Sequence, residues 1–455
     1  MPQTLLHNSG VLTMHGTGAL IPNGAVLVEG KMIKAVGRTE DILPLAAPDA
    51  EKIDLSGKWI LPGLINTHVH TSQQLGRGLG DDVGLLTWLH ERIWPYESTL
   101  TEEDSYISSL LTGIELIRSG VTTFCEAGGQ HVNGMGRAVT ELGLKAILCR
   151  STMDAGEGLP RPWQIDTDES LRRNVEDFDN WHGKAGGRIR ACLGLRTIFN
   201  NSDDLIVRTS KLARERGTLV NMHVAEIPYE NEWAAKRRGL HTVSHLDALG
   251  VLGPEFLAVH CVWLSDDEIK MFADKGVKVS HNPAAAMRVL GMPKIVEMQA
   301  AGVCVSIGTD GAPSSNRMTL IDEMWVTALL HKLRMGSPEA MPAERILGMV
   351  TREAARSLHW DAEIGSIHPG KRADLAIINP ATATMLPMHD PVANFVNAMR
   401  EHNVESVMAD GQWLMRERKL LTVDEPAVIA ASIAAADAIR ARAGIKLPQR
   451  FPVLA

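Results

Sequence analysis

LPGLINTHVH, residues 61–70, joins an apolar strand-like run to a pair of histidines. The run Leu61–Asn66 predicts a β-strand, because it is short, apolar and bounded by a Pro-Gly turn signal. His68 and His70 follow it two residues apart, and alternate side chains of an extended chain project to the same side. The stretch therefore predicts a strand that ends in two imidazoles facing one common site.

Seven further runs of this kind follow along the middle of the chain, with helix-like stretches such as Glu102–Ser119, Asp203–Arg216 and Asn231–Leu249 between them. Ser265-Asp-Asp-Glu268 forms a capping box, and Gly276 ends the helix that it begins. Eight such alternations predict an α/β fold with a (β/α)8 TIM barrel. The eight predicted strands are Leu61–Asn66, Thr122–Glu126, Lys145–Arg150, Ile189–Leu195, Leu219–His223, Phe256–His260, Val277–His281 and Val303–Thr309.

Both ends of the chain are strand-rich, and the ends of a barrel chain emerge close together. We therefore predict that the two ends form one small composite β-sandwich domain. The predicted division is residues 1–58 for the first part of the sandwich, 59–363 for a metal-dependent barrel, 364–421 for the second part, and 422–455 for a helical tail that includes the Ala-rich stretch Pro426–Ala443.

Composition excludes several classes of protein. The 455 residues carry 46 Lys+Arg against 54 Asp+Glu, a net charge of −8, which gives no electrostatic reason to bind nucleic acid. The five cysteines are odd in number and form no C-x-x-C pair, as in a reduced cytoplasmic protein. We find neither a secretory signal nor the roughly 18 apolar residues needed to span a membrane. The predicted partner is a small molecule.

Four more polar side chains stand where predicted strands end. His223 ends the fifth run with Glu226 just beyond it, His260 ends the sixth, and Asp310 follows the eighth. Each alone is ordinary, but a closed barrel brings the carboxyl ends of its strands together at one face. Together with the first histidine pair, they indicate a site for a divalent metal and for proton transfer.

On these residues the chain resembles the amidohydrolase superfamily, over nearly its whole length from Gly10 to about Leu421. The resemblance implies the barrel, the composite sandwich and one divalent metal ion, most often Zn²⁺ and sometimes Fe²⁺. A lysine ending the fourth strand would imply two metals, but Arg196 stands there. The matching stretches are LPGLINTHVH (61–70), HVAE (223–226), HCV (260–262), GTDG (308–311) and GSIHPGKRADLAII (365–378). The implied metal ligands are His68, His70, His223 and Asp310, and the implied catalytic residues are Glu226, His260 and Asp310.

Within the superfamily the chain is most similar to the 5-methylthioadenosine/S-adenosylhomocysteine deaminases, through GRGLGDDVGLLTWLHERIWPYE at residues 76–97. That similarity implies substrate-binding roles for Glu97, Arg150, Glu226 and His260. Arg196 takes the place of the substrate-binding histidine of that family, which puts an adenosine-type substrate in question. The residues themselves leave another interpretation open: Glu97 as an early-turn helix acid, and Arg150 in a structural ion pair.

We therefore predict a metal-dependent hydrolytic deaminase of an aminated nitrogen heterocycle, which releases ammonia. A bound divalent cation lowers the pKa of water from about 16 to about 7. Asp310 then accepts the water's proton, Glu226 protonates a ring nitrogen and the leaving amine, and His260 stabilises the attacking oxygen.

Other functions stay open at this stage. One is an s-triazine hydrolase that removes chloride or an amine, another is a guanine- or pterin-type deaminase, and a remote one is a non-catalytic scaffold. A homo-oligomer is compatible with the chain. His281, which ends the seventh predicted strand, is more typical of a structural residue than of a ligand.

Overall fold

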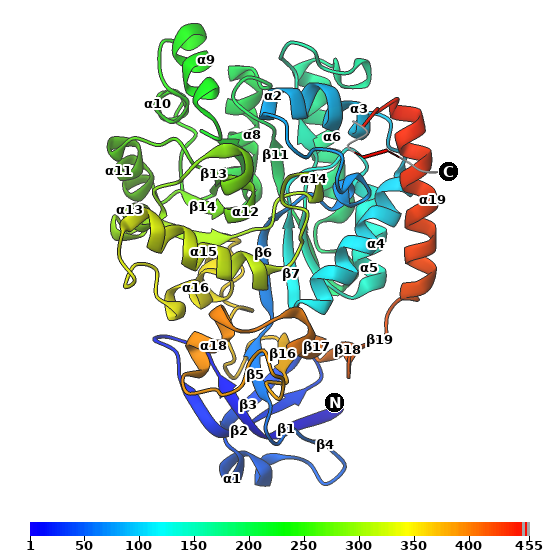
Figure 1. Ribbon diagram of the computed structural model, residues 1–455, viewed down its shortest axis with the longest axis vertical. Helices are drawn as coiled ribbons and strands as arrows, with labels where there is room; N and C mark the ends of the chain where they lie inside the picture. The colour runs from blue at the N-terminus through cyan, green and yellow to red at the C-terminus, as the bar shows by residue number, and fades with distance from the viewer. Residues whose placement is uncertain (448–450, 453–455) are drawn as a thin grey trace.

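The computed structural model describes residues 1–447 and 451–452. Figure 1 shows a helix-covered barrel above a smaller, strand-rich body that both ends of the chain enter. The predicted α/β class, a (β/α)8 TIM barrel with an additional domain from both chain ends, is confirmed, and the strands of the predicted β-sandwich form one nine-stranded sheet. The barrel strands are β6 (Leu64–Val69), β7 (Val121–Glu126), β8 (Lys145–Leu148) with β9 (Ser151–Thr152), β10 (Ile189–Ala191) with β11 (Leu193–Leu195), β12 (Val220–Val224), β13 (Phe256–His260), β14 (Lys278–His281) and β15 (Cys304–Ile307).

The barrel strands are parallel and close into a ring. One ladder runs β10-β8-β7-β6, and the other runs β15-β14-β13-β12-β11-β9. The ladders meet around Cys192, whose N–H donates to the Leu148 carbonyl at 2.9 Å. They meet again where the N–H groups of Thr309 and Asp310 both donate to the His68 carbonyl at 3.0 Å. This second junction places the end of the eighth barrel strand directly beside the end of the first barrel strand, β6.

The first predicted strand needs a correction, because Leu61–Asn66 spans two strands. Leu61 belongs to β5 (Trp59–Pro62), which lies in the lower sheet, and the barrel strand begins at Leu64. Gly63 joins the two, and its N–H donates to the Asp374 carbonyl at 2.9 Å. Both strands are apolar and buried, so the sequence reads as one run.

Helices cover the outside of the barrel, and the predicted capping box at Ser265–Glu268 is present, as is another at Thr101–Asp104. The predicted helix over Asn231–Leu249 is two helices, because Gly239 adopts a left-handed conformation (φ 80°) that ends the first one. The main outer helices are α4 (Glu102–Arg118), α5 (Val132–Leu142), α6 (Thr167–Trp181), α8 (Asp203–Arg216), α9 (Pro228–Arg238), α10 (Thr242–Ala248), α11 (Asp266–Lys275), α13 (Ile295–Ala300), α15 (Leu320–Met335), α16 (Ala343–Met349) and α17 (Arg352–Ser357).

The two chain ends meet in one nine-stranded sheet with the order β19-β18-β17-β16-β5-β1-β2-β3, with β4 beside β1. The junction is antiparallel pairing of β16 with β5, with Ile377 opposite Ile60. Apolar side chains from both ends, such as Leu6 and Met408, share one buried cluster. The strands are β1 (Gln3–Leu12), β2 (Leu20–Glu29), β3 (Met32–Arg38), β4 (Glu51–Asp54), β5, β16 (Leu375–Ile378), β17 (Val404–Ala409), β18 (Gln412–Arg416) and β19 (Lys419–Leu420).

A buried ion cluster ties this sheet to the amino-terminal end of the barrel. Lys145, the first residue of β8, is fully buried, and its Nζ lies 2.6 Å from Oδ1 of both Asp374 and Asp410. Asp410 also pairs with Arg372 at 2.9 Å. Each charge therefore has an oppositely charged partner, as a buried charge requires.

The predicted tail helix is α19 (Glu425–Ala443), drawn in red along α4 in Figure 1. Ile439 of this helix packs with Leu75, Tyr96 and Leu100 in one cluster. Of the predicted tail 422–455, residues 448–450 and 453–455 lie outside the described part of the chain. Among the described residues, we find no helix with both the length and the apolar composition needed to cross a bilayer.

Candidate active site

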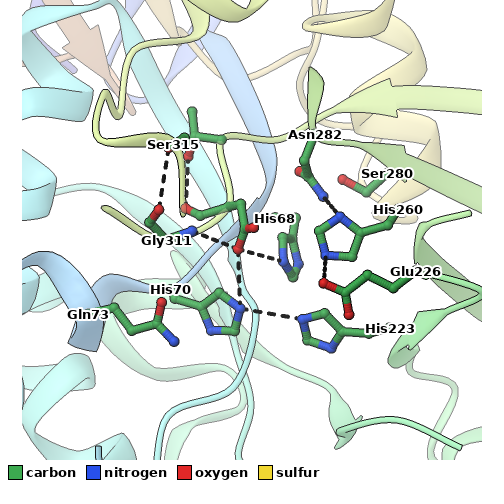
Figure 2. Close-up of polar contacts among 12 residues, drawn as sticks. His68, His70, Gln73, His223, Glu226, His260, Ser280, Asn282, Gly311 and Ser315 are labelled. Carbon is green, nitrogen blue, oxygen red and sulfur yellow. Dashed lines mark hydrogen bonds and ion pairs between the residues drawn. The ribbon is translucent and has the colours of Figure 1, made fainter. Parts of the chain in front are cut away.

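Three imidazoles and one carboxylate converge at the carboxyl ends of the barrel strands. His68 and His70 come from β6, His223 comes from β12, and Asp310 follows β15. Asp310 Oδ1 lies 3.6 Å from His68 Nε2 and 3.5 Å from His70 Nε2. His70 Nε2 lies 3.4 Å from His223 Nε2. Figure 2 shows the three imidazoles pointing toward one another. The structure thus brings the four predicted ligands together.

The backbone explains why Asp310 faces inward. It adopts a left-handed conformation (φ 62°), and the N–H of Gly311 donates to its Oδ1 at 2.7 Å. Gly308 passes so close to β6 that a Cβ there would lie 2.7 Å from the His68 carbonyl. The turn after β15 therefore packs closely against β6, the strand that bears His68.

The donor set fits a divalent cation. His223 Nδ1 faces the Arg196 carbonyl at 3.0 Å, and a carbonyl only accepts, so Nδ1 carries the proton and Nε2 presents a lone pair to the cluster. Both ring nitrogens of His68 are buried and find no hydrogen-bond partner among the described residues. Burial lowers the pKa of His70 and His223 well below the usual value, so both imidazoles are neutral. Neutral imidazoles around a carboxylate are ligands that Zn²⁺ and similar ions accept.

Charge in the cluster rests on Asp310. Burial alone would raise the pKa of this carboxyl, but the nearby imidazoles of His68, His260 and His70 lower it below its ordinary range. The carboxylate is therefore ionised at neutral pH, and its negative charge is available to a bound cation.

Glu226 and His260 form a second pair beside the cluster. His260 Nε2 lies 3.6 Å from Glu226 Oε1, and Asn282 Nδ2 donates to His260 Nδ1 at 3.1 Å (Figure 2). With Nδ1 accepting, the neutral ring carries its proton on Nε2, toward the site. Glu230 fixes the backbone at Glu226, because its carboxylate accepts hydrogen bonds from the N–H groups of Ala225 and Glu226 at 2.8 and 2.9 Å.

The pKa values of this pair are displaced in opposite directions. Burial, and then the charge of Asp310, raise the pKa of Glu226 to about 8. Burial lowers the pKa of His260 to about 3. At neutral pH the carboxyl group therefore holds a proton and the imidazole is uncharged, which is the state needed for a general acid beside a neutral donor.

Arg196 lies on the wall of the same pocket, with Leu85, Trp88 and Leu89. Its Nη1 is 3.9 Å from Glu97 Oε2, and Glu97 Oε1 accepts from Gln73 Nε2 at 2.7 Å. The structure thus places Arg196 in the pocket and Glu97 directly behind it.

Arg150 lies elsewhere, which corrects its predicted place at the substrate. Its Nε donates to Asp177 Oδ2 at 2.6 Å, and its Nη1 donates to the Gln130 carbonyl at 2.6 Å. It lines a different cavity, with Trp163. The reason is that Arg150 stands between β8 and β9, within the third barrel strand and before its end, where its side chain reaches Asp177 and Gln130.

His281 is also absent from the pocket walls. Its Nε2 lies 3.2 Å from Nε2 of His331, and both rings are buried. Three residues that support the site were not predicted: Gln73, Glu230 and Asn282. The pair Asn282-Pro283 directly after a strand end was the one available sequence signal, since strand ends of a barrel carry its polar groups.

Comparison with known proteins agrees with this geometry. The amidohydrolase family model matches residues 59–414. A 5'-deoxyadenosine deaminase of Methanobrevibacter smithii is 37% identical over 405 residues, which are 88% of this chain and 90% of that protein. A 5-methylthioadenosine/S-adenosylhomocysteine deaminase of Syntrophomonas wolfei is 35% identical over 431 residues, 94% of this chain and 96% of that one. The crystal structure of an adenosine deaminase from Xanthomonas campestris with bound zinc superposes with a TM-score of 0.92 at 27% identity, and covers 97% of this chain and 99% of that one.

Proposed function

The chain belongs to the amidohydrolase family, and we propose that it is a metal-dependent hydrolytic deaminase of an aminated nitrogen heterocycle. The observation that carries this proposal is the position of Glu226, a carboxyl group 3.6 Å from His260 Nε2 and beside a cluster of metal-binding type. Relatives named as deaminases of adenosine compounds support the same reaction class. Attack on the ring needs a proton on the ring nitrogen in either reaction, but only loss of ammonia needs a further proton on the leaving group, so the names of these relatives, rather than Glu226, favour ammonia over chloride.

We propose His68, His70, His223 and Asp310 as the metal ligands, with Zn²⁺ as the expected ion. The unpartnered nitrogens of His68 support this assignment, as does the zinc in the Xanthomonas structure. When bound, such an ion lowers the pKa of a water molecule to about 7, and so supplies hydroxide near neutral pH. Fe²⁺ remains the alternative.

The protein's own groups then move the protons. Asp310 accepts the proton that the attacking water gives up, and Glu226 delivers one to the ring nitrogen beside the attacked carbon. His260 donates from Nε2 to the oxygen as charge develops on it. Glu226 next takes the proton of the hydroxyl group on the attacked carbon and passes it to the amine nitrogen, and the C–N bond breaks. The proton held by Asp310 returns to Glu226, and the products are ammonia and an oxo heterocycle. A cytoplasmic location and a homo-oligomer stay predictions.

The test is ammonia release from a panel of aminated purines, pterins and s-triazines, with chloride release measured on a chloro-triazine and metal content measured on the same sample. Glu226→Gln is expected to keep the metal and to lose turnover by about 100-fold or more. Glu232→Gln, the same change on an exposed side chain of α9, is the matched control. Full activity in Glu226→Gln would remove this residue from the proton path, and chloride release without ammonia release would favour the triazine hydrolase.

A further inference from the structure

Arg196 is a buried cation without hydrogen bonds. Its side chain is 6% exposed. Within residues 1–447 and 451–452, no carbonyl or side chain accepts a hydrogen bond from its guanidinium. The closest negative charge is Glu97 Oε2 at 3.9 Å, which is beyond hydrogen-bonding distance. The backbone of Arg196 is firmly held, because its N–H donates to Thr152 and its carbonyl faces His223. The charged end alone lacks partners.

Arg150 shows what a structural arginine looks like in this barrel. It stands between β8 and β9, and it donates to Asp177 and to Gln130 with two bonds of 2.6 Å. Burying a charge without such bonds is costly. A guanidinium that the protein leaves unsatisfied inside the pocket of the proposed reaction is therefore one that a ligand completes.

Glu97 accepts no hydrogen bond from Arg196, and its carboxyl group is bound by Gln73 instead. Gln73 Nε2 donates to Glu97 Oε1 at 2.7 Å, and burial raises the pKa of the Glu97 carboxyl above its usual value. Gln73 is fully buried, and its own carbonyl oxygen has no partner among the described residues. Glu97 therefore offsets part of the charge and orients the guanidinium, but it leaves the N–H groups free.

The chemistry of guanidinium defines the missing group. It has N–H donors only, in a planar fork, and it stays charged at any pH that proteins tolerate. It binds oxygen acceptors, and it disfavours a second donor such as an amino group at the same place. The pocket between this fork and the metal-binding type cluster is narrow in this structure, with a volume of about 20 Å³, which is well below that of usual ligand pockets. Trp88 and Leu89 on its wall offer apolar surface for a flat ring.

We propose that Arg196 makes the pocket selective for aminated heterocycles that also carry a ring oxo group, whose oxygen accepts hydrogen bonds from the guanidinium. This inference rests on the proposed deaminase function and narrows its substrate from aminated heterocycles in general to oxo-substituted ones. Adenosine-type compounds, which have no ring oxo group, are then poorer substrates.

The effect of the oxo group can be measured with pairs of substrates that each carry one amino group and differ only in one oxo group. Isoguanine differs from adenine by a 2-oxo group, and guanine differs from 2-aminopurine by a 6-oxo group. For the metal-loaded protein we expect kcat/KM for the oxo member of at least one pair to be about 10- to 100-fold higher, the range for a hydrogen bond to a charged group. Arg196→Met should reduce that ratio to about threefold or less, with Arg196→Lys between the two.

Arg150→Met is the control, because it removes a second, partly buried arginine from outside the pocket, and its ratio should match the wild type. Thermal unfolding of each variant shows whether it is folded, and Arg196→Lys keeps the test open if Arg196→Met is not. An unchanged ratio in the folded Arg196 variants, or a wild type that prefers adenine and 2-aminopurine, would overturn the proposal.

Calorimetric binding of hypoxanthine against purine separates this proposal from the proposed function, because it needs no turnover. Arg196-dependent preference for hypoxanthine with no ammonia release from any compound would sink the deaminase assignment and leave the Arg196 assignment standing. Ammonia release without any preference for oxo-substituted compounds would support the deaminase function and overturn the Arg196 assignment.

Discussion

Two clusters of buried charge stand at opposite ends of the barrel and are built in opposite ways. At the amino-terminal end, Lys145 contacts Asp374 and Asp410, both at 2.6 Å. At the carboxyl end, Asp310 lies 3.5 Å or more from the imidazoles of His68 and His70. The first cluster has close, opposite charges, and the second has electron-rich groups that face one another without contact.

The difference separates stability from chemistry. Close pairing in the Lys145 cluster fastens the barrel to the small sheet, and leaves little for a ligand to add. The histidine cluster places no opposite charge close to Asp310, which leaves that charge to the proposed metal ion. In TIM barrels the amino-terminal face serves stability and the carboxyl face serves function, so each cluster is found where its role is needed.

The largest expected effect comes from breaking the histidine cluster. His68→Ala removes a proposed ligand, so bound zinc should fall below about a tenth of the wild-type content, and ammonia release should fall at least about 100-fold. Mass spectrometry of the metal in purified protein and an ammonia assay measure the two. His389→Ala, on an exposed histidine, is the control. A variant with full zinc content would show that His68 is no ligand.

A change in the Lys145 cluster should lower the stability of the fold and leave metal binding unchanged. Lys145→Met leaves Asp374 and Asp410 buried beside each other without their shared cation, which should lower the free energy of unfolding by about 3–5 kcal/mol. Zinc content per folded molecule should stay at the wild-type value. Equilibrium denaturation measures the loss against Lys52→Met, a surface control. Equal stability of the two variants would mean that this cluster does not fasten the sheet.

The smallest effect concerns Glu126, a buried carboxyl at the end of β7. Its Oε2 accepts from the Thr71 N–H at 3.1 Å, one residue beyond His70, and burial raises its pKa from 4.5 to about 7. Between these pH values the folded protein keeps a proton that the unfolded chain has lost, so this group's contribution to stability falls as pH rises from about 4.5 to 7.

Glu126→Gln cannot titrate, so its melting temperature relative to the wild type should rise by a few degrees between pH 5 and pH 8. Thermal unfolding across that range measures the difference, with Glu232→Gln as the control. Parallel curves for wild type and Glu126→Gln would show that Glu126 does not titrate on unfolding.

Much of the fold and of the site was predictable from sequence for one reason. In a parallel barrel the residue after each strand lies at the same face, so finding the strand ends places His68, His223, His260 and Asp310 without knowledge of their contacts. The roles of these residues are proposals, but their meeting follows from topology.

What could not be predicted depends on side-chain partners. Arg150 and Arg196 both end predicted strands, and only the structure shows that Arg150 lies between β8 and β9 and pairs with Asp177, whereas Arg196 follows β11 and lines the pocket. Asn282 and Glu230 act through bonds to other side chains and backbone groups, which no local pattern encodes.

Gly63 decides how far the molecule can be shortened. Pro62 ends β5 and Leu64 begins β6, so one residue separates the small sheet from the strand that bears His68. A Cβ at Gly63 would lie 2.2 Å from Thr122 Oγ1, so a larger residue would push the strands apart. Removal of the small sheet would therefore release the first residues of β6, the strand that bears His68.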